Sequence, residues 1–256
     1  MPRLEWQIEG GVAHVRLARP DRRNAIDIAM WDEIADVFVR LGACDSVRCI
    51  LFGSVTPAVF SVGADLAEFR TARTDAAGAR AYEGCMRRAI DAVRECRHPV
   101  VSRLSGLCLG GGIELALLTD LRIASTTLRC GIPVNRTGQW LPPADLAGLV
   151  TAVGLSVAKE LILEGRILDA DDACARGIVS RVVPPERLNE EVEAAVARIA
   201  AGSPGAARWH KRVLNAAASG DPDPGDLADV YRSADSPDYR EGLAAFFDKR
   251  APVFPA

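Results

Sequence analysis

The chain has few of the residues that would signal a metal site or a disulfide framework. It holds three histidines and seven cysteines in 256 residues, and no two cysteines form a CxxC pair. An odd number of scattered cysteines, most of them inside apolar runs, is typical of reduced thiols in a core. His14, His98 and His210 are isolated, so they lack metal-ligand spacing, and none is tied to a GxSxG-type nucleophile. We therefore expect no metal site and no Ser–His–Asp hydrolase.

Charge and long apolar runs are also scarce. The net charge is −3, the pI is near 5.7, and there is no run of five or more like charges. This balance argues against a nucleic-acid partner. No apolar stretch approaches the roughly 18 residues of a membrane span, and the N-terminus alternates apolar and polar residues rather than resembling a signal peptide. The sequence predicts a cytoplasmic protein without a membrane span.

The glycine motifs of phosphate-binding loops are missing, since neither GxxxxGK[ST] nor GxGxxG occurs. Three glycines instead lie in LGGGIELAL (109–117) and run into an apolar segment whose only polar residue is Glu114. Glycine costs roughly 0.5–1 kcal/mol relative to alanine inside a helix. The amides of a helix's first turn lack intrahelical acceptors, so glycines at that place let another molecule approach the backbone.

A second turn of this kind lies around Gly63-Ala64. Two such turns that converge on one oxygen would form an oxyanion hole, which stabilises negative charge on a carbonyl. Glu114 beside it would be a usable acid or base, because desolvation raises the pKa of a carboxyl group. The alternative from the residues alone is that the glycines only permit close packing and that Glu114 is solvated.

Periodicity predicts strands that alternate with helices in the first half of the chain. Residues 4–9 and 12–17 alternate with period two around Gly10-Gly11 and predict a hairpin. The other predicted strands are 47–53, 98–104 and 121–125, and the predicted helices are 30–41, 65–70, 82–93 and one that starts at Gly110–Gly112. Because the order of strand, glycine turn and helix occurs twice, the fold class is α/β.

Beyond about residue 144 the pattern becomes mostly helical. Predicted helices cover 157–165, 168–177 and 188–199, with a strand at 178–183. The segment GSPG (202–205) marks the best boundary, which gives a core of residues 1–202 and a helical C-terminal region of residues 203–256 that includes the flexible segment SGDPDPGD (219–226). The last helix ends in Phe246 and Phe247, which need either a partner subunit or the same chain's core to cover them.

Four segments resemble motifs of the crotonase family, the enoyl-CoA hydratases and isomerases, and they occur in the same order. ARPDRRNAID (18–27) resembles RPxxxNAL, and VFSVGADLAEF (59–69) resembles AFxAGADLxEF. LSGLCLGGGIELALLTDLRIA (104–124) resembles NGxxxGGGxELALxCDxxIA, and EGLAAFFDKRAPVF (241–254) resembles EGxxAFxEKRxPxF. The resemblance runs nearly end to end. It implies a spiral of ββα repeats and a helical C-terminal region that builds homotrimers or dimers of trimers.

The resemblance also implies roles for individual residues. The backbone amides of Ala64 and Gly111 would form the hole for the thioester oxygen, and Glu114 would be the first of the two hydratase glutamates. Coenzyme A would be part of the substrate, with no prosthetic group. Its expected contacts are Arg23, Ala25, Ala64, Asp65 and Leu66, together with Phe246 and Lys249 of a neighbouring subunit. Lys249 and Arg250 would reach the CoA phosphates bound by a neighbouring subunit. The alternative is that both are solvated charges on the surface.

One departure concerns the second hydratase glutamate. The family segment FGxPExxLGxxPGxGG corresponds to CGIPVNRTGQWLPPADL (130–146), so Val134 stands at the glutamate position. Valine cannot transfer a proton, and each general acid or base contributes about 10²–10⁴-fold. The replacement argues against efficient hydration.

Three interpretations follow. In the first, Glu114 alone moves protons, as an isomerase or a slow hydratase. In the second, another residue replaces the lost acid: Asp145 is the nearest carboxylate, and Asn135, Arg136 and Gln139 are polar substitutes. We weigh Asp145 more as a solvent-facing helix start after Pro142-Pro143 than as a catalytic group. In the third, the protein only binds acyl-CoA, although a binder needs no buried carboxylate.

Smaller departures lie around the same motifs. Ala67 stands where the family often has a lysine that helps to hold CoA, and Ser61 and Val62 replace small residues, which would narrow the acyl tunnel. Trp140 lines the acyl pocket or fills the core, and core filling is the commoner fate of a tryptophan. The sequence thus predicts an acyl-CoA enzyme that stabilises a thioester enolate, with enoyl-CoA hydratase/isomerase of fatty acid metabolism, a lyase or an isomerase, as its working description. Another enolate reaction, such as decarboxylation or C–C bond hydrolysis, is the alternative.

Overall fold

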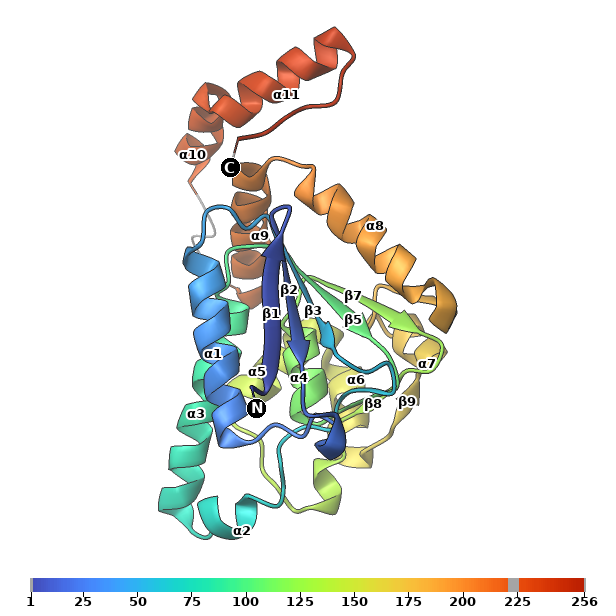
Figure 1. Cartoon of the computed structure of the whole chain (residues 1–256). Helices are drawn as coiled ribbons and strands as arrows, with labels where there is room; N and C mark the ends of the chain where they lie inside the picture. The colour runs from blue at the N-terminus through green and yellow to red at the C-terminus, as the bar shows by residue number, and fades with distance from the viewer. Residues whose placement is uncertain (1, 221–225, 256) are drawn as a thin grey trace.

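A computed structural model describes residues 2–220 and 226–255, and its strands form two sheets (Figure 1). The larger sheet has six strands in the order β1-β2-β3-β5-β7-β10, and the smaller has four in the order β4-β6-β8-β9. The strands are β1 (Leu4–Glu9), β2 (Val12–Leu17), β3 (Cys49–Ser54), β4 (Val59–Ser61), β5 (Val100–Leu104), β6 (Leu107–Leu109), β7 (Leu121–Ser125), β8 (Arg129–Gly131), β9 (Leu168–Asp169) and β10 (Arg181–Val183).

Helices cover these sheets and make up the end of the chain. They are α1 (Ile28–Ala43), α2 (Phe69–Ala72), α3 (Ala76–Arg94), α4 (Gly111–Leu117), α5 (Pro143–Val153), α6 (Leu155–Lys159), α7 (Ala170–Ala175), α8 (Leu188–Ala200), α9 (Pro204–Ser219), α10 (Leu227–Arg232) and α11 (Pro237–Asp248). Short 3-10 turns are η1 (Pro20–Arg22), η2 (Val134–Arg136), η4 (Pro185–Arg187) and η5 (Ser233–Asp235), and η3 (Glu160–Glu164) is a π-helical turn. The helix predicted over 157–165 is therefore interrupted, and residues 221–225 of the predicted flexible segment lie outside the described residues.

The predicted hairpin opens the larger sheet. β1 and β2 pair antiparallel around Gly10 and Gly11, whose φ angles of +56° and +81° favour glycine. Every second residue of β2, namely Ala13, Val15 and Leu17, is fully buried, which explains the period of two in the sequence. β2 then pairs parallel with β3, and β3, β5, β7 and β10 continue the sheet in parallel.

Successive repeats supply one strand to each sheet and then a helix. β3 of the larger sheet is followed by β4 of the smaller one, β5 by β6, and β7 by β8; α3, α4 and α5 follow these pairs. This is the spiral of ββα repeats that the resemblance implied. The strands of the smaller sheet hold only two or three residues, so they are too short to produce a periodic sequence pattern.

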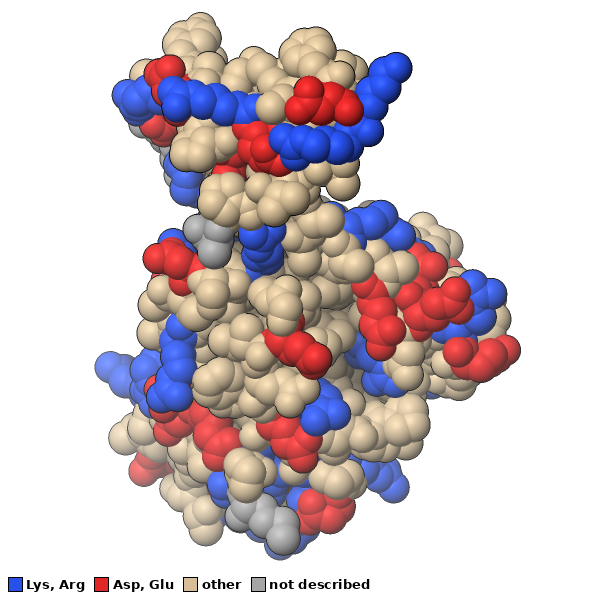
Figure 2. All heavy atoms as spheres, turned by 45° about the horizontal axis from the view of Figure 1, so that its top comes forward, with Lys and Arg blue, Asp and Glu red and all other residues tan. Residues whose placement is uncertain are grey.

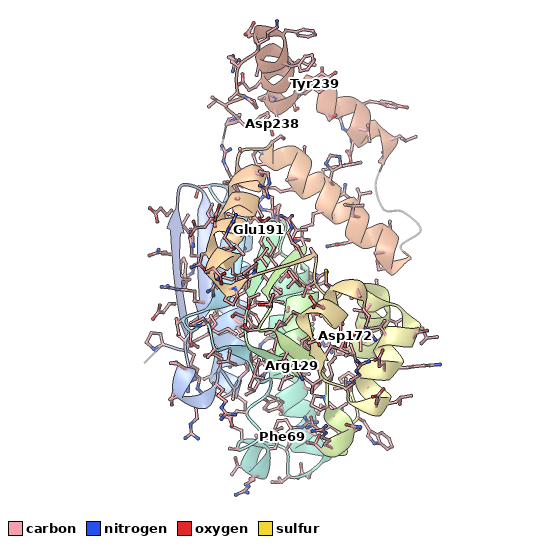
Figure 3. All side chains as sticks on the ribbon, turned by 90° about the vertical axis from the view of Figure 1, so that its right-hand side faces the viewer. Phe69, Arg129, Asp172, Glu191, Asp238 and Tyr239 are labelled. Atoms are coloured by element: carbon pink, nitrogen blue, oxygen red, sulfur yellow. The ribbon has the colours of Figure 1, made fainter. Side chains whose placement is uncertain are left out.

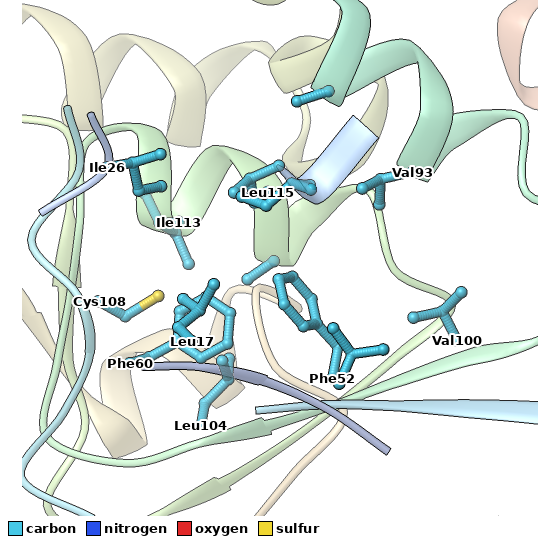
Figure 4. Packing of buried hydrophobic residues seen from close by; sticks show 14 of the residues in the cluster. Leu17, Ile26, Phe52, Phe60, Val93, Val100, Leu104, Cys108, Ile113 and Leu115 are labelled. Carbon is cyan, nitrogen blue, oxygen red and sulfur yellow. The ribbon is translucent and has the colours of Figure 1, made fainter. Parts of the chain in front are cut away.

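A continuous apolar core lies between the larger sheet and the helices. The ring of Phe52 meets those of Phe38 and Phe60 edge to face, with centroids 5.4 and 5.3 Å apart. Figure 4 shows that Ile113 and Leu115 of α4 also point into this core. Full burial of such a side chain stabilises the fold by about 1.5–3 kcal/mol. Because Ile113 and Leu115 anchor one face of α4, Glu114 between them lies on the face toward α3 and α5.

The C-terminal helices form a lobe that stands out from the body (Figures 1 and 2). α9 is tied to the core by the buried Lys211, whose Nζ donates to Asp120 Oδ2 and to the His98 carbonyl, each at 2.8 Å. Phe246 and Phe247 of α11 are 76% and 74% exposed, so the idea that the chain's own core covers them is wrong. The division of the chain at residue 202 stays a prediction.

All seven cysteines are free thiols, as their spacing predicted, and Cys49, Cys96, Cys108 and Cys130 are buried. Within residues 2–220 and 226–255, no helix combines the length and apolarity needed to cross a membrane.

Buried His98 makes the fold sensitive to acid. Neither of its ring nitrogens has a hydrogen-bond partner among the described residues. Burial, with Arg208 and Arg97 close by, lowers its pKa from 6.5 to about 4. The unfolded chain therefore takes up a proton below pH 6.5 that the folded chain does not take up until about pH 4, so stability falls as the pH drops through this range. The total loss is up to about 3 kcal/mol at 1.36 kcal/mol per pH unit.

Urea unfolding at pH 7.5, 5.5 and 4.5 measures this loss. We expect the free energy of unfolding to fall more steeply for the wild type than for His98→Gln, which cannot titrate and keeps the backbone carbonyl that Lys211 binds. Carboxyl groups contribute equally to both proteins, so the difference isolates His98. Parallel curves for the two proteins would show that protonation of His98 does not limit stability.

Candidate active site

Two glycine turns from consecutive repeats meet at the ends of β4 and β6. These strands pair in parallel, with Ser61 opposite Cys108. Gly63 and Gly110 have φ angles of +89° and +51°, which favour glycine. A Cβ atom on Gly63 would lie 2.8 Å from the Leu109 carbonyl oxygen and 2.9 Å from the Gly111 nitrogen. Only glycine allows the two turns to approach this closely.

The approach brings two backbone amides together. A Cβ atom on Gly111 would lie 3.7 Å from the Ala64 nitrogen, and both residues are partly exposed. Across residues 2–220 and 226–255, neither the Ala64 amide nor the Gly111 amide donates a hydrogen bond. Two adjacent donors without acceptors can bind one oxygen that carries negative charge.

Ser61 and Asn24 hold the first of these turns. The Ser61 hydroxyl donates to the Asn24 carbonyl at 2.7 Å and accepts from the Gly63 amide at 3.0 Å. Asn24 has a φ of +52° and is fully buried, and its side-chain amide donates to the Phe60 carbonyl at 2.8 Å. Ser61, which the sequence suggested would narrow the acyl tunnel, is therefore a buried brace of the turn.

The residues expected to contact CoA from the same subunit lie next to this turn. The Ile26 amide donates to the Gly63 carbonyl at 2.8 Å, which aligns Arg23 and Ala25 with the loop of Ala64. Arg23 is exposed and Ala25 is nearly buried.

In the loop itself, Leu66 is exposed and Asp65 is engaged within the protein. The Asp65 carboxylate lies 3.3 Å from Arg19 Nη1, and the same guanidinium lies 3.2 Å from Asp27. Asp65 thus fixes the loop, and its partner is Arg19, the arginine of the segment that resembles RPxxxNAL, which sequence reasoning did not name as a site residue.

Glu114 lines a small pocket between α3, α4 and α5. The pocket has a solvent-accessible volume of about 40 Å³, and its apolar walls include Ile90, Leu118 and Leu149. Burial raises the pKa of Glu114 from 4.5 to about 7, the charge of Asp145 adds to this rise, and Arg87 opposes it. Glu114 can therefore both accept and release a proton near neutral pH.

Asp145 lines the same pocket, and the interpretation of a solvent-facing helix start is wrong. Its side chain is 5% exposed, and Oδ1 accepts a hydrogen bond from Arg87 Nη2 at 2.6 Å. Arg87 also donates to Glu83 Oε1 at 2.9 Å. A carboxylate after two prolines is exposed unless another element supplies a partner, and here α3 supplies one.

The segment that carries Val134 brings no other acid to Glu114. Val134 begins η2 and packs against the core, Asn135 donates to the carbonyl of Leu163 at 3.2 Å, and Gln139 donates to Thr137 at 2.9 Å. None of these side chains lines the pocket of Glu114 in the described part of the chain.

Trp140 and Arg136 of this segment also face solvent rather than the pocket. Trp140 is 93% exposed, so the expectation that it fills the core is wrong, and it does not line the small pocket of Glu114. That it lines the acyl pocket stays a prediction. Arg136 is exposed.

Phe246 and Lys249 lie far from Glu114 within one chain. Both belong to the end of α11, in the protruding lobe, whereas α4 lies in the body (Figure 1). Figure 3 shows the same separation. Phe69 ends the loop that carries Ala64, and it lies at the opposite end of the molecule from Tyr239 of α11. Arg250 is engaged by Glu241 at 2.7 and 2.9 Å. The described residues contain no group of three His, Cys, Asp or Glu side chains that could hold a metal ion.

Known proteins share this architecture along the whole chain. The family profile described as enoyl-CoA hydratase/isomerase matches residues 7–256. The crystal structure of an enoyl-CoA hydratase/carnithine racemase from Magnetospirillum magneticum is 41% identical with a TM-score of 0.95, over 100% of this chain and 96% of that one. A putative enoyl-CoA hydratase/isomerase family protein from Hyphomonas neptunium is 30% identical with a TM-score of 0.93, over 99% and 98%. A probable enoyl-CoA hydratase of Mycobacterium leprae is 34% identical over 247 residues, which cover 95% of this chain and 94% of the relative.

Proposed function

The chain belongs to the enoyl-CoA hydratase/isomerase, or crotonase, family, and from this premise we propose that it catalyses proton transfer on an acyl-CoA thioester. The observation that supports this proposal most directly is that the neighbouring backbone amides of Ala64 and Gly111 donate no hydrogen bond within the described residues. Removal of a proton next to a thioester carbonyl places negative charge on the carbonyl oxygen, and two fixed donors stabilise that charge. Coenzyme A enters this chemistry only as part of the substrate.

In this proposal Glu114 carries the proton. As a carboxylate it takes the proton from the carbon next to the thioester, and the electron pair moves onto the thioester oxygen held by Ala64 and Gly111. Return of the proton to the same carbon gives exchange with solvent, and its return two carbons further along a 3-enoyl chain moves the double bond. Both outcomes need a single acid–base group, which suits a site that has Val134 in place of the second glutamate.

Hydration needs a second group, and Asp145 is our candidate. Water adds at the β-carbon while one proton goes to the α-carbon, so one group must activate the water and another must deliver the proton. Of the polar residues considered for this role, Asp145 is the one that lines the pocket of Glu114. Glu114 and Asp145 flank a space that accommodates water, since a water molecule needs about 10–15 Å³ of such volume.

A panel of saturated, 2-enoyl and 3-enoyl CoA thioesters in D₂O tests the proposal. We expect deuterium at the α-carbon, together with water addition to the 2-enoyl chain or migration of the 3-enoyl double bond. Mass spectrometry and NMR detect each of these products. Loss of carbon dioxide or of a carbon fragment from added 3-keto or carboxylated thioesters would instead indicate the decarboxylase or C–C hydrolase alternative. Thioesters that bind and emerge unlabelled would contradict the proposal and favour an acyl-CoA-binding protein.

We further propose a homotrimer, or a dimer of trimers, in which Phe246 and Lys249 reach the CoA of a neighbouring subunit. The exposure of Phe246 and Phe247 supports this assembly, because adjacent large apolar side chains on a monomer's surface mark an interaction site. The same lobe also has a cleft of about 510 Å³ between α9, α10 and α11, with Trp209 and Leu243 in its walls.

A further inference from the structure

A partly buried ion pair joins α3 to α5 next to Glu114. Arg87 Nη2 contacts Asp145 Oδ1 at 2.6 Å, and the same Nη2 contacts Glu83 Oε1 at 2.9 Å. The Asp145 side chain is 5% exposed and lines the pocket of Glu114. The pair thus places a fixed negative charge beside the proposed proton carrier.

The geometry of this pair is poor for a contact that only braces two helices. Arginine and aspartate commonly form two parallel hydrogen bonds, which use two nitrogens and both carboxylate oxygens. Here Arg87 Nη1 and Asp145 Oδ2 are buried and have no hydrogen-bond partner within the described residues. The two atoms are therefore not used by the contact between α3 and α5, and the pocket that Asp145 lines gives its carboxylate an access to Glu114 that a brace between helices does not need.

Few other charges face Glu114. From α3 it is approached by Glu83, Arg87 and Arg94, and Arg94 is engaged by Asp91 at 3.0 Å. α5 contributes Asp145.

The strands that pack against α4 are β6 and β4, and the only titratable group in them is the buried Cys108, whose pKa is raised well above its usual value, so its thiol is neutral. Among the charges that act on Glu114, that of Asp145 is therefore the largest, and Arg87 opposes it, while burial remains the main cause of the raised pKa of Glu114.

Resting on the proposed function, we propose that Arg87 is a positioning residue that fixes the charged Asp145 carboxylate beside Glu114, and that this charge holds the transferable proton on Glu114. A buried carboxylate without a partner would itself take up a proton. Two carboxyl groups that share one pocket compete for one proton, and a cation beside one of them decides where that proton resides. Arg87 contacts Asp145 directly, so the proton goes to Glu114.

The test follows the titration of Glu114 itself by ¹³C NMR of protein labelled at the glutamate carboxyl carbon, with Glu114→Gln to assign the signal. We expect Asp145→Asn to lower the titration midpoint of the Glu114 carboxyl group by about one pH unit, because the negative charge of the neighbouring Asp145 side chain is removed. Arg87→Met in the Asp145→Asn background should raise the midpoint again, because a cation has been removed. Arg87→Lys keeps the cation and should leave the wild-type midpoint in place.

Variants and controls are chosen so that folding does not obscure the answer. Arg87→Met alone would strand a buried charge at a cost of about 3–5 kcal/mol, whereas loss of both partners of a buried pair is often neutral. Arg88→Met is the matched control, since Arg88 lies on the same helix, is exposed and pairs with Asp32. It should not move the midpoint.

The inference is overturned if the titration midpoint of Glu114 is unchanged in Asp145→Asn and in the double variant while only the melting temperature changes. The ion pair would then be a structural contact between α3 and α5. The readout does not need turnover. If the wild type exchanges no α-protons, the proposed function fails while the midpoints still decide the role of Arg87. If exchange is found and the midpoints do not move, the proposed function stands and the inference about Arg87 fails.

Discussion

Replacement of Glu114 by glutamine is expected to lower the rate of α-proton exchange by about 10²–10⁴-fold, the usual contribution of a general acid–base group. Glutamine keeps the shape of the side chain and cannot take up a proton, so thioester binding should change little. The pH profile provides a second reading. Because the pKa of Glu114 is raised to about 7 and exchange begins with its carboxylate form, the wild-type rate should rise as the pH increases through 7. The variant should lack this rise.

The measurement is the exchange rate in D₂O between pH 5.5 and 8.5, with thioester affinity determined in parallel. Glu193→Gln on α8 is the matched control, because Glu193 is exposed and does not line the pocket of Glu114. The same substitution should increase stability although it decreases activity. A carboxyl group whose pKa is higher in the folded chain than in the unfolded chain lowers the free energy of unfolding as the pH rises from 4.5 past 7. Glu114→Gln should therefore unfold at a higher temperature than the wild type at pH 8. A variant that exchanges protons at the wild-type rate would remove Glu114 from the mechanism.

The second large effect concerns the amide of Gly111. Gly111 is the first residue of α4, a position where proline fits a helix because its missing N–H has no helical acceptor. Gly111→Pro should therefore preserve the helix while it removes one donor of the proposed oxyanion hole. Loss of one such donor lowers kcat by about 10²–10³-fold. The comparison is with Gly111→Ala, which keeps the N–H.

Both substitutions add a Cβ atom that would lie 3.2 Å from the Trp31 ring, so the cost of moving that ring enters both variants. The ratio of their kcat/KM values for exchange then reports the loss of the N–H together with the ring carbon that takes its place. Circular dichroism and melting temperature verify that both variants fold. Equal rates for the proline and alanine variants would mean that the thioester oxygen does not lie against Gly111.

Much of this fold is encoded in local sequence patterns. Alternation around Gly10-Gly11 predicts the hairpin, and the glycines at 63 and 110–112 predict two tight turns, at which the structure has positive φ angles for Gly63 and Gly110. The smaller sheet is different. Its strands are two or three residues long, and they exist because the spiral places them side by side, which no local pattern expresses.

The candidate site divides in the same way. Glu114 stands out in the sequence as a carboxylate in an apolar helix that follows a glycine turn. Asp145 has the local signature of an exposed helix start, and it is buried because Arg87, 58 residues earlier, reaches it from α3. Arg87 is one of 31 basic residues in the chain and has no motif of its own. Contacts of this range follow from the packing of helices, so sequence reasoning named the carboxylate and missed its partner.

The two converging amides have a consequence for how this scaffold changes over evolutionary time. They are main-chain atoms, fixed by the pairing of β4 with β6 and by the absence of side chains at Gly63 and Gly110. Substitution of a side chain elsewhere in the site does not remove them, because both donors belong to the main chain. In the function proposed above, the main-chain amides are thus the constant part of the site, and the side chains of α3, α4 and α5 are the part that substitution can exchange. Divergence of this kind can alter which proton moves without first dismantling the device that makes its removal feasible.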